Sequence, residues 1–156
     1  MIVPISVGIM LAKKSTEKYR QAELVYNAIA EIEALITYQA MTVSDIFEAV
    51  FSNERYKCLN FDVFNNCESN IYSEKISYIF LKNDSLLLEK EYISELKAFF
   101  LSLGKGDIES QQKICRLYIE KFENYSKTLR EKTVKDAKMY RSLGVLFSIF
   151  VAILFI

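Results

Sequence analysis

The chain has 156 residues, 51% of them hydrophobic and 26% charged, which suits one compact domain and is too apolar for a disordered chain. Its 20 basic and 20 acidic side chains cancel, so the net charge gives no support for nucleic-acid binding. The absence of histidine excludes Ser/His/Asp and Cys/His catalytic sets.

Proline and glycine are scarce, with one and four residues respectively, and this leaves few of the turns that a multi-strand sheet needs. The composition therefore predicts an all-α fold. The three cysteines form no C-x-x-C pattern, and we interpret them as free, mostly buried thiols in a reduced compartment: Cys58, Cys67 and Cys115.

The N-terminal segment, residues 1–12, is apolar and is followed by Lys13, Lys14, Lys18 and Arg20. As a helix it would be about 18 Å long, which is too short to cross the ~30 Å hydrocarbon core of a bilayer alone. We interpret it as a membrane segment, either a shortened anchor packed on the C-terminal helix or part of a longer one. Basic residues that flank the domain of residues 13–141 at both ends predict that this domain is cytoplasmic.

The first long helix is predicted to continue from this segment to about Tyr38. Its apolar side chains recur every three or four residues: Leu24, Val25, Ala28, Ile29, Ile32, Leu35 and Ile36. Thr42 or Ser44 can cap a short second helix. That helix would contain Ile46, Phe47 and Val50.

The middle of the chain is predicted to hold three further helices. Phe61 and Phe64 indicate one short helix between residues 53 and 70. Ser73 is the expected N-cap of the next, because apolar residues follow it on one helical face. The third runs from about Leu86 to Leu103, with apolar residues at spacings of four, three and four.

The segment Gly104-Lys105-Gly106-Asp107 is the clearest turn in the chain. Gly104 suits the left-handed residue that ends a helix, and Asp107 suits the N-cap of the helix that follows. A phosphate-binding loop would require G-x-x-x-x-G-K-[ST] after a strand, and neither condition holds here. We therefore predict a helix-to-helix turn.

The last helix begins at Ile108 and meets no glycine before Gly144. Seven positions of this helix, which we call the seam, follow one another at alternating spacings of three and four residues, as in a heptad repeat: Ile108, Gln111, Cys115, Tyr118, Phe122, Tyr125 and Leu129. A basic stretch from Lys127 to Arg141 follows. We consider three compatible interpretations of it: a solvated stalk, a contact with anionic lipid headgroups, and a docking site for an acidic partner.

Residues 142–156 contain no charged side chain, and eleven of them are Leu, Ile, Val or Phe. As a helix they span about 22 Å, or about 27 Å counted from Met139 with Lys138 and Arg141 extended toward the interface. The sequence therefore predicts a C-terminal transmembrane helix. It would be continuous with an antiparallel helical bundle of about six helices.

Two C-terminal motifs resemble those of the stage III sporulation protein AB family. The family's L-G-x-S-D-x-x-x-Q turn resembles Leu103, Gly104, Lys105, Gly106, Asp107 and Gln111. Its K-M-W-R-S-L-G entry to a terminal membrane helix resembles Lys138, Met139, Tyr140, Arg141, Ser142, Leu143 and Gly144. Gly106 and Tyr140 replace the usual serine and tryptophan.

The resemblance implies a non-enzymatic membrane platform of the secretion-like channel that joins mother cell and forespore during endospore formation. Its helical domain would be similar to the cytoplasmic domains of F-type platform proteins of type II secretion. The expected location is the mother-cell membrane around the forespore. The implied partners are a cytoplasmic secretion-type ATPase, other membrane subunits and lipid, without cofactor, nucleic acid or small-molecule substrate. We expect the turn from Leu103 to Gln111 to bind a partner and residues 138–144 to enter the membrane.

A second class of function is a general membrane-tethered helical adaptor, or a coiled-coil dimer, unrelated to sporulation. In that case the seam from Ile108 to Leu129 would pack between two chains.

Overall fold

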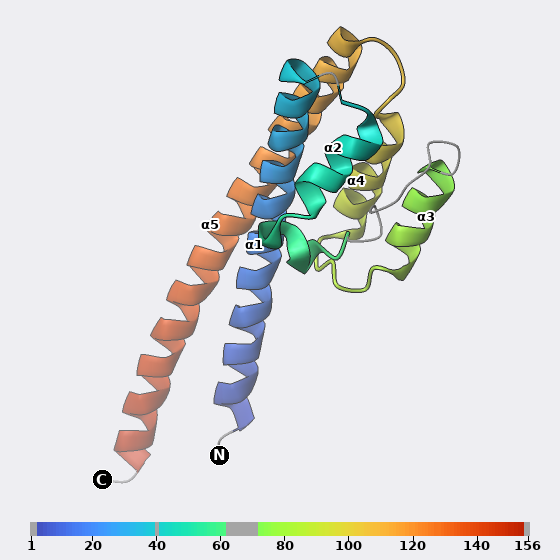
Figure 1. Ribbon diagram of the computed structural model, residues 1–156. Helices are drawn as coiled ribbons and strands as arrows, with labels where there is room; N and C mark the ends of the chain where they lie inside the picture. Colours follow the sequence, from blue (N-terminus) through green and yellow to red (C-terminus); the bar gives the residue numbers. More distant parts are fainter. Residues whose placement is uncertain (1–2, 40, 62–71, 155–156) are drawn as a thin grey trace.

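Two long antiparallel helices and a cluster of shorter helices at one end of the pair make up the computed structural model of the chain, which describes residues 3–39, 41–61 and 72–154 (Figure 1). The long helices are α1 (Val3–Tyr38) and α5 (Ile108–Leu154). The shorter ones are α2 (Val43–Phe51), the 3₁₀ helix η1 (Glu54–Leu59), α3 (Tyr72–Lys82) and α4 (Lys90–Ser102). The described residues contain six helices and no strand, which confirms the prediction of an all-α bundle.

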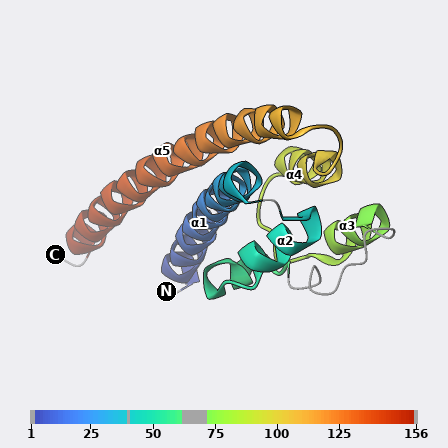
Figure 2. The same ribbon diagram turned by 45° about the horizontal axis from the view of Figure 1, so that its top comes forward.

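The pair formed by α1 and α5 is the frame of the molecule. Gln112 Nε2 donates to Thr37 Oγ1 at 3.1 Å near one end of the pair, and the hydroxyls of Ser15 and Thr133 lie 3.2 Å apart toward the other. These two contacts lie 22 residues apart on α1 and 21 residues apart on α5. The helices therefore stay level with each other along this length, and both chain termini lie at the same end (Figures 1 and 2).

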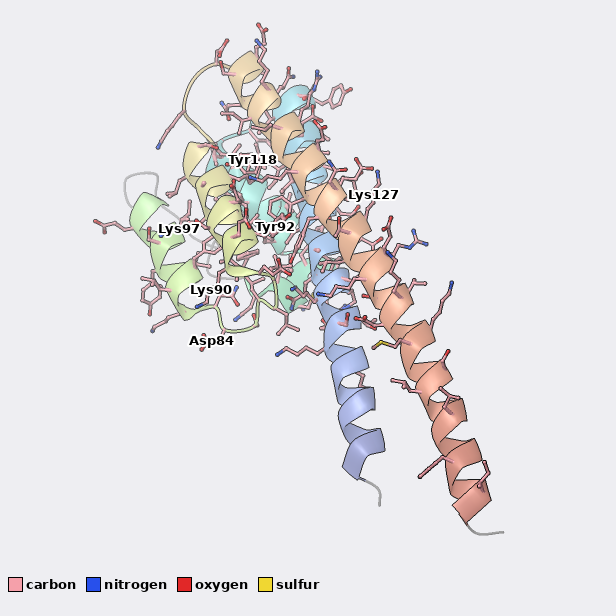
Figure 3. The ribbon with its side chains drawn as sticks, turned by 180° about the vertical axis from the view of Figure 1, so that it is seen from behind. Asp84, Lys90, Tyr92, Lys97, Tyr118 and Lys127 are labelled. Atoms are coloured by element: carbon pink, nitrogen blue, oxygen red, sulfur yellow. The ribbon has the colours of Figure 1, made fainter. Side chains whose placement is uncertain are left out.

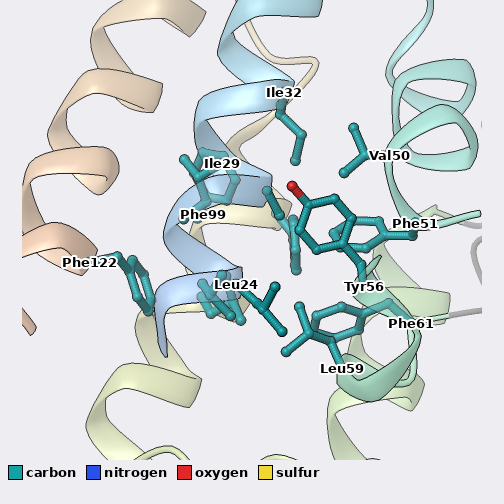
Figure 4. Packing of buried hydrophobic residues seen from close by; sticks show 14 of the residues in the cluster. Leu24, Ile29, Ile32, Val50, Phe51, Tyr56, Leu59, Phe61, Phe99 and Phe122 are labelled. Atoms are coloured by element: carbon teal, nitrogen blue, oxygen red, sulfur yellow. The ribbon is translucent and has the colours of Figure 1, made fainter. Parts of the chain in front are cut away.

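The core lies between α1 and the short helices, with α3 farthest from the long pair (Figure 2). Rings from α2, α4 and the segment after η1 form its centre, where Phe100 packs against Phe47, Phe51 and Phe61 at centroid distances of 5.1, 5.9 and 5.6 Å. Apolar side chains of α1 such as Ile29 close this centre from the other side (Figure 4). The predicted stripe on the first helix is thus confirmed as the buried face of α1.

The heptad seam of the last helix is buried at Cys115, Phe122, Tyr125 and Leu129, and Tyr118 among them is half-buried. Its first position is different, because the Ile108 side chain is 60% exposed. Ile108 lies in the first turn of α5, at the end of the bundle away from the chain termini, where few neighbours remain to cover it (Figure 1). Ile108 therefore does not belong to the packed part of the seam, although it has the heptad spacing.

Thr42, and not Ser44, caps α2. Its side-chain oxygen accepts from Asp45 N–H at 3.2 Å, and the Asp45 carboxylate accepts from Thr42 N–H at 3.3 Å. This reciprocal capping box satisfies two backbone donors that the first turn of a helix would otherwise leave unpaired.

A short helix is present in the range predicted between residues 53 and 70, as η1, but it ends before Phe61. Asn60 ends η1 with a left-handed backbone at φ 53°. Phe61 is buried beyond this turn, whereas Phe64 and Cys67 lie outside the described residues. The predicted start of the next helix is wrong, because Ser73 is already helical in α3 and is not the N-cap.

The helix predicted from Leu86 begins four residues later, at Lys90. Side chains of other helices bind the backbone just before it. Gln21 binds Ser85 and Leu87, and the Tyr125 hydroxyl accepts from Glu89 N–H at 3.2 Å. These tertiary hydrogen bonds hold the segment in a non-helical conformation.

The boundaries predicted between the membrane segments and the domain fall inside helices. α1 continues across residues 12 and 13, and α5 across residues 141 and 142, without interruption. Among the described residues, no helix combines the length and apolar character that a membrane crossing requires, so the transmembrane helix predicted over residues 142–156 is not confirmed.

Candidate functional site

The turn between α4 and α5 lies at the end of the bundle opposite both termini (Figure 1). Gly104 and Gly106 have φ angles of +77° and +96°, a region that side chains disfavour. Asp107 is the N-cap of α5, as predicted, because its Oδ1 accepts from Ser110 N–H at 3.2 Å. The Ser110 hydroxyl first, and then this backbone hydrogen bond, lower the pKa of the exposed Asp107 carboxyl. The aspartate thus stays charged at the positive end of the helix dipole.

Gln111 fastens this turn from the first turns of α5. Its Oε1 accepts from Gly104 N–H at 3.3 Å, and its Nε2 donates to Gly106 C=O at 3.4 Å. One amide side chain therefore binds the backbone of both glycines. The spacing from Gly104 to Gln111 in the motif has a structural explanation, and Gln111 is a positioning residue of the turn.

Replacing Gly104 by alanine is expected to lower the free energy of unfolding by about 2 kcal/mol, since a left-handed backbone costs an ordinary residue roughly 1–2 kcal/mol. The added Cβ would also lie 3.2 Å from Val43 Cγ2, which is a tight contact. Urea denaturation of the full chain in mild detergent, followed by circular dichroism, measures the change. Lys105→Ala is the control and should change stability by less than about 0.5 kcal/mol; an equal loss in both variants would contradict this role of Gly104.

The surface around the turn presents the cation of Lys105 and the exposed apolar side chains of Tyr38 and Ile108. Lys105 is exposed, and no hydrogen bond or ion pair joins it to another residue of the described ranges. Tyr38, at the end of α1, is 84% exposed, and Ile108 lies at the start of α5. The hydrogen bond between Thr37 and Gln112 keeps these two helix ends together. Lys105 is therefore the motif residue that is available to a partner without a role in holding the turn.

The second motif, residues 138–144, lies on α5 beyond Leu129, the last buried residue among those whose burial the structure describes. Met139 and Leu143 are 50% and 53% exposed. The side chains of Tyr140 and Arg141 lie outside the described part of the structure. Further apolar side chains on the same helix are also exposed: Leu146, Phe150 and Ile153.

The two motifs do not form one site. Ile108 and Lys138 are separated by 30 helical residues, which corresponds to about 45 Å along α5. The molecule thus has two candidate interaction regions at opposite ends, a turn at the distal end and an apolar stem at the end of the termini (Figure 1).

Polar side chains that fasten α1 and α5 to the short helices were not identified from the sequence. Gln21 is buried at 3% exposure between α1 and the 83–89 loop. Tyr56 donates to Glu31 Oε2 at 2.8 Å, and burial, with that acidic partner, raises the pKa of Tyr56 to about 12. Nothing in the local sequence distinguishes these residues from surface polar residues, because their partners lie far away in the chain.

Glu33 of α1 forms an ion pair with Arg116 of α5 at 3.5 Å. The adjacent Cys115 is fully buried, and burial raises the pKa of its thiol to about 12. The thiol is therefore neutral at physiological pH and unsuited to nucleophilic chemistry. Another buried seam residue, Tyr125, faces Tyr92 of α4 in a stacked pair 3.5 Å apart between ring centroids (Figure 3). The seam side of α5 thus packs within its own chain.

Comparison with known proteins is consistent with these features. The stage III sporulation protein AB family matches residues 1–156, which is the whole chain. The stage III sporulation protein AB of Bacillus subtilis (strain 168) is 27% identical, over 94% of this chain and 89% of the relative. No solved structure matches the chain. Because the family match covers the full sequence and includes both motifs, the chain belongs to the stage III sporulation protein AB family.

Proposed function

We propose that this protein is a non-enzymatic membrane platform of the secretion-like channel between mother cell and forespore, required for endospore formation. Family membership supports the link to stage III of sporulation. The platform role, the mother-cell membrane location and the partners come from the resemblance of the helical domain to F-type secretion platforms.

The observation that supports a platform most strongly is the polarity of the molecule. The antiparallel pair of α1 and α5 brings both apolar ends of the chain to one side (Figure 1). The cluster of short helices, with the motif turn, lies on the other side. Such an arrangement suits a protein that is anchored at one end and binds a partner at the other.

The anchored end would be the stem formed by residues 3–12 of α1 and 142–154 of α5. On α5, Leu143, Leu146, Phe150 and Ile153 are 53–69% exposed. A row of exposed apolar side chains of this kind is typical of a surface that contacts a membrane or another protein. In the proposal the two apolar ends insert together into the mother-cell membrane and meet the other membrane subunits there.

The free end would bind the cytoplasmic secretion-type ATPase through the distal turn. Lys105 is the side chain best placed for this, since Gln111 and the two glycines serve to hold the turn.

The second class of function, a coiled-coil dimer through the seam of α5, has little support. Phe122 and Leu129 of that seam are 0% and 5% exposed within a single chain, which leaves no surface for a second one.

Deleting the gene should block spore formation after engulfment and prevent gene expression in the forespore, and the wild-type gene should restore both. Heat-resistant spore counts and a forespore-specific reporter measure these outcomes. A normal spore yield in the deletion strain would overturn the proposal.

The distal turn is tested separately with Lys105→Glu in the same strain. This variant should lose pull-down of the sporulation ATPase and lower the spore count at least tenfold, while its circular dichroism spectrum and membrane fraction stay unchanged. Lys90→Glu, an equal charge change on α4, is the matched control and should behave as wild type. If both variants sporulate normally and bind the ATPase, the turn is not the docking site.

A further inference from the structure

A group of basic side chains surrounds the stem just before its apolar ends, and we call it the basic belt. Its members are Lys13 and Lys14 of α1, and Arg130, Lys132, Lys135 and Lys138 of α5. All six are exposed. Within the described ranges none of them has an ion pair or hydrogen bond, whereas seven basic side chains elsewhere pair with carboxylates.

The tertiary structure brings two separate parts of the sequence to one height. Ser15 and Thr133 contact each other through their hydroxyls at 3.2 Å. Lys13 and Lys14 immediately precede Ser15, and Lys132 immediately precedes Thr133. Lys13 and Lys14 therefore lie level with the basic residues of α5 near Thr133, although more than 110 residues separate them in the chain.

The belt extends around the pair of α1 and α5 next to the stem and does not lie on one face. With 3.6 residues per turn, Lys138, Lys135 and Lys132 point about 80°, 140° and 200° away from Arg130 around α5. The remaining arc contains the buried Leu129 and the half-buried Thr133, which contacts Ser15 of α1. A protein partner seated on one face would contact only part of such a belt. A layer of negative charge around the stem would contact all of it.

The height of the belt fits a lipid headgroup layer. Arg130 to Lys138 covers about 12 Å along α5. The headgroup region of one leaflet is roughly 5–8 Å thick, and long basic side chains extend several ångströms toward it along the helix. The exposed apolar residues Leu143, Leu146 and Phe150 follow directly on the side of the termini. Only Glu131 and Asp136 oppose the charge within the two segments of the belt.

We infer that the basic belt binds the phosphate groups of anionic lipids and sets the depth at which the stem sits in the membrane. This inference rests on the membrane anchorage in the proposed function and adds a lipid specificity to it. Each basic side chain near an anionic surface raises the affinity by about fivefold. Six cations at one height would therefore give a strong preference for an anionic bilayer, which salt would weaken.

The test uses the full chain, synthesised without detergent in the presence of vesicles and recovered by flotation. Vesicles of phosphatidylcholine alone are compared with vesicles that contain 30% phosphatidylglycerol, in titrations at low and high salt. The belt variant carries Lys13→Gln, Lys14→Gln, Lys135→Gln and Lys138→Gln. The control variant carries Lys82→Gln, Lys90→Gln, Lys97→Gln and Lys105→Gln and loses the same charge; Lys90 and Lys97 lie on α4, away from the stem (Figure 3).

Wild type and control should bind both vesicles and prefer the anionic ones by at least about 30-fold at low salt, whereas the belt variant should lose at least tenfold of this preference. Equal affinity of wild type for both vesicles would overturn the belt and leave the anchorage intact. An equal loss of lipid preference in the belt variant and the control variant would also overturn the belt, since the net charge of the protein and not the position of the lysines would then determine the preference. Wild type that binds only anionic vesicles would support the belt and contradict the apolar anchor. A belt variant that keeps its lipid preference but loses another channel subunit would assign the belt to a protein partner instead.

Discussion

Replacing Phe100 by alanine should lower the free energy of unfolding by about 4 kcal/mol, more than any other single substitution considered for this chain. Phe100 is 1% exposed, and its ring lies within 6 Å, between centroids, of five other aromatic rings: Phe47, Phe51, Phe61, Phe80 and Phe99. These rings come from α2, α3, α4 and the segment after η1. Without the Phe100 ring all five contacts are lost, and the cluster of short helices would loosen.

The cost includes a cavity, because the core around Phe100 has no spare volume. The space that it borders with Val25 and Leu59 does not admit a water molecule. Chemical denaturation of the full chain in mild detergent, followed at 222 nm, measures the loss, and near-ultraviolet circular dichroism reports on the packed rings. Phe150→Ala is the control, since Phe150 is 59% exposed on the stem. A loss below about 1.5 kcal/mol for Phe100→Ala would show that the ring cluster can collapse into the space.

Replacing Gln21 by alanine should lower the free energy of unfolding by about 3 kcal/mol, because two backbone groups would lose their partner. Gln21 Nε2 donates to Ser85 C=O at 2.9 Å, and its Oε1 accepts from Leu87 N–H at 2.7 Å. The side chain is buried, so water cannot replace both bonds without opening the contact. The segment before α4 should become mobile, and hydrogen exchange at the Leu87 amide should become faster.

Two further substitutions separate the hydrogen bonds from side-chain volume. Gln21→Glu keeps an acceptor for Leu87 N–H but places an oxygen opposite the Ser85 carbonyl, so it should destabilise the chain as well. Gln39→Ala, at an exposed position after α1, should be neutral. If Gln21→Ala changed stability by less than about 1 kcal/mol with unchanged exchange at Leu87, the proposed fastening of this segment would be wrong.

Several elements could be predicted from the sequence because the forces that form them are local. The apolar period of three and four residues on α1 and α5 needs only neighbouring turns of the same helix. Thr42 caps α2 through a residue three positions away, and the glycines of the distal turn follow from backbone sterics. The motif turn was therefore located correctly, although its link to a partner stays a prediction.

Other features depend on contacts between distant residues. α4 begins at Lys90 and not at Leu86, because Gln21 and Tyr125 bind the backbone before it. The ring of Phe61 is buried without being helical, since η1 ends at Asn60 and directs the chain toward Phe100. Local periodicity contains no information about partners of this kind.

By itself, the sequence determined that the chain is all-helical, that α5 continues unbroken from the distal turn into an apolar tail, and that the chain resembles one sporulation family. Those conclusions follow from helix periodicity, from the positions of glycine and from two motifs. Only the tertiary structure decided that the seam of α5 is buried in its own chain and that Gln111 fastens the turn. It also brought Lys13 and Lys14 level with the basic residues around Thr133, because the antiparallel packing of α1 on α5 sets the height of each residue on the stem.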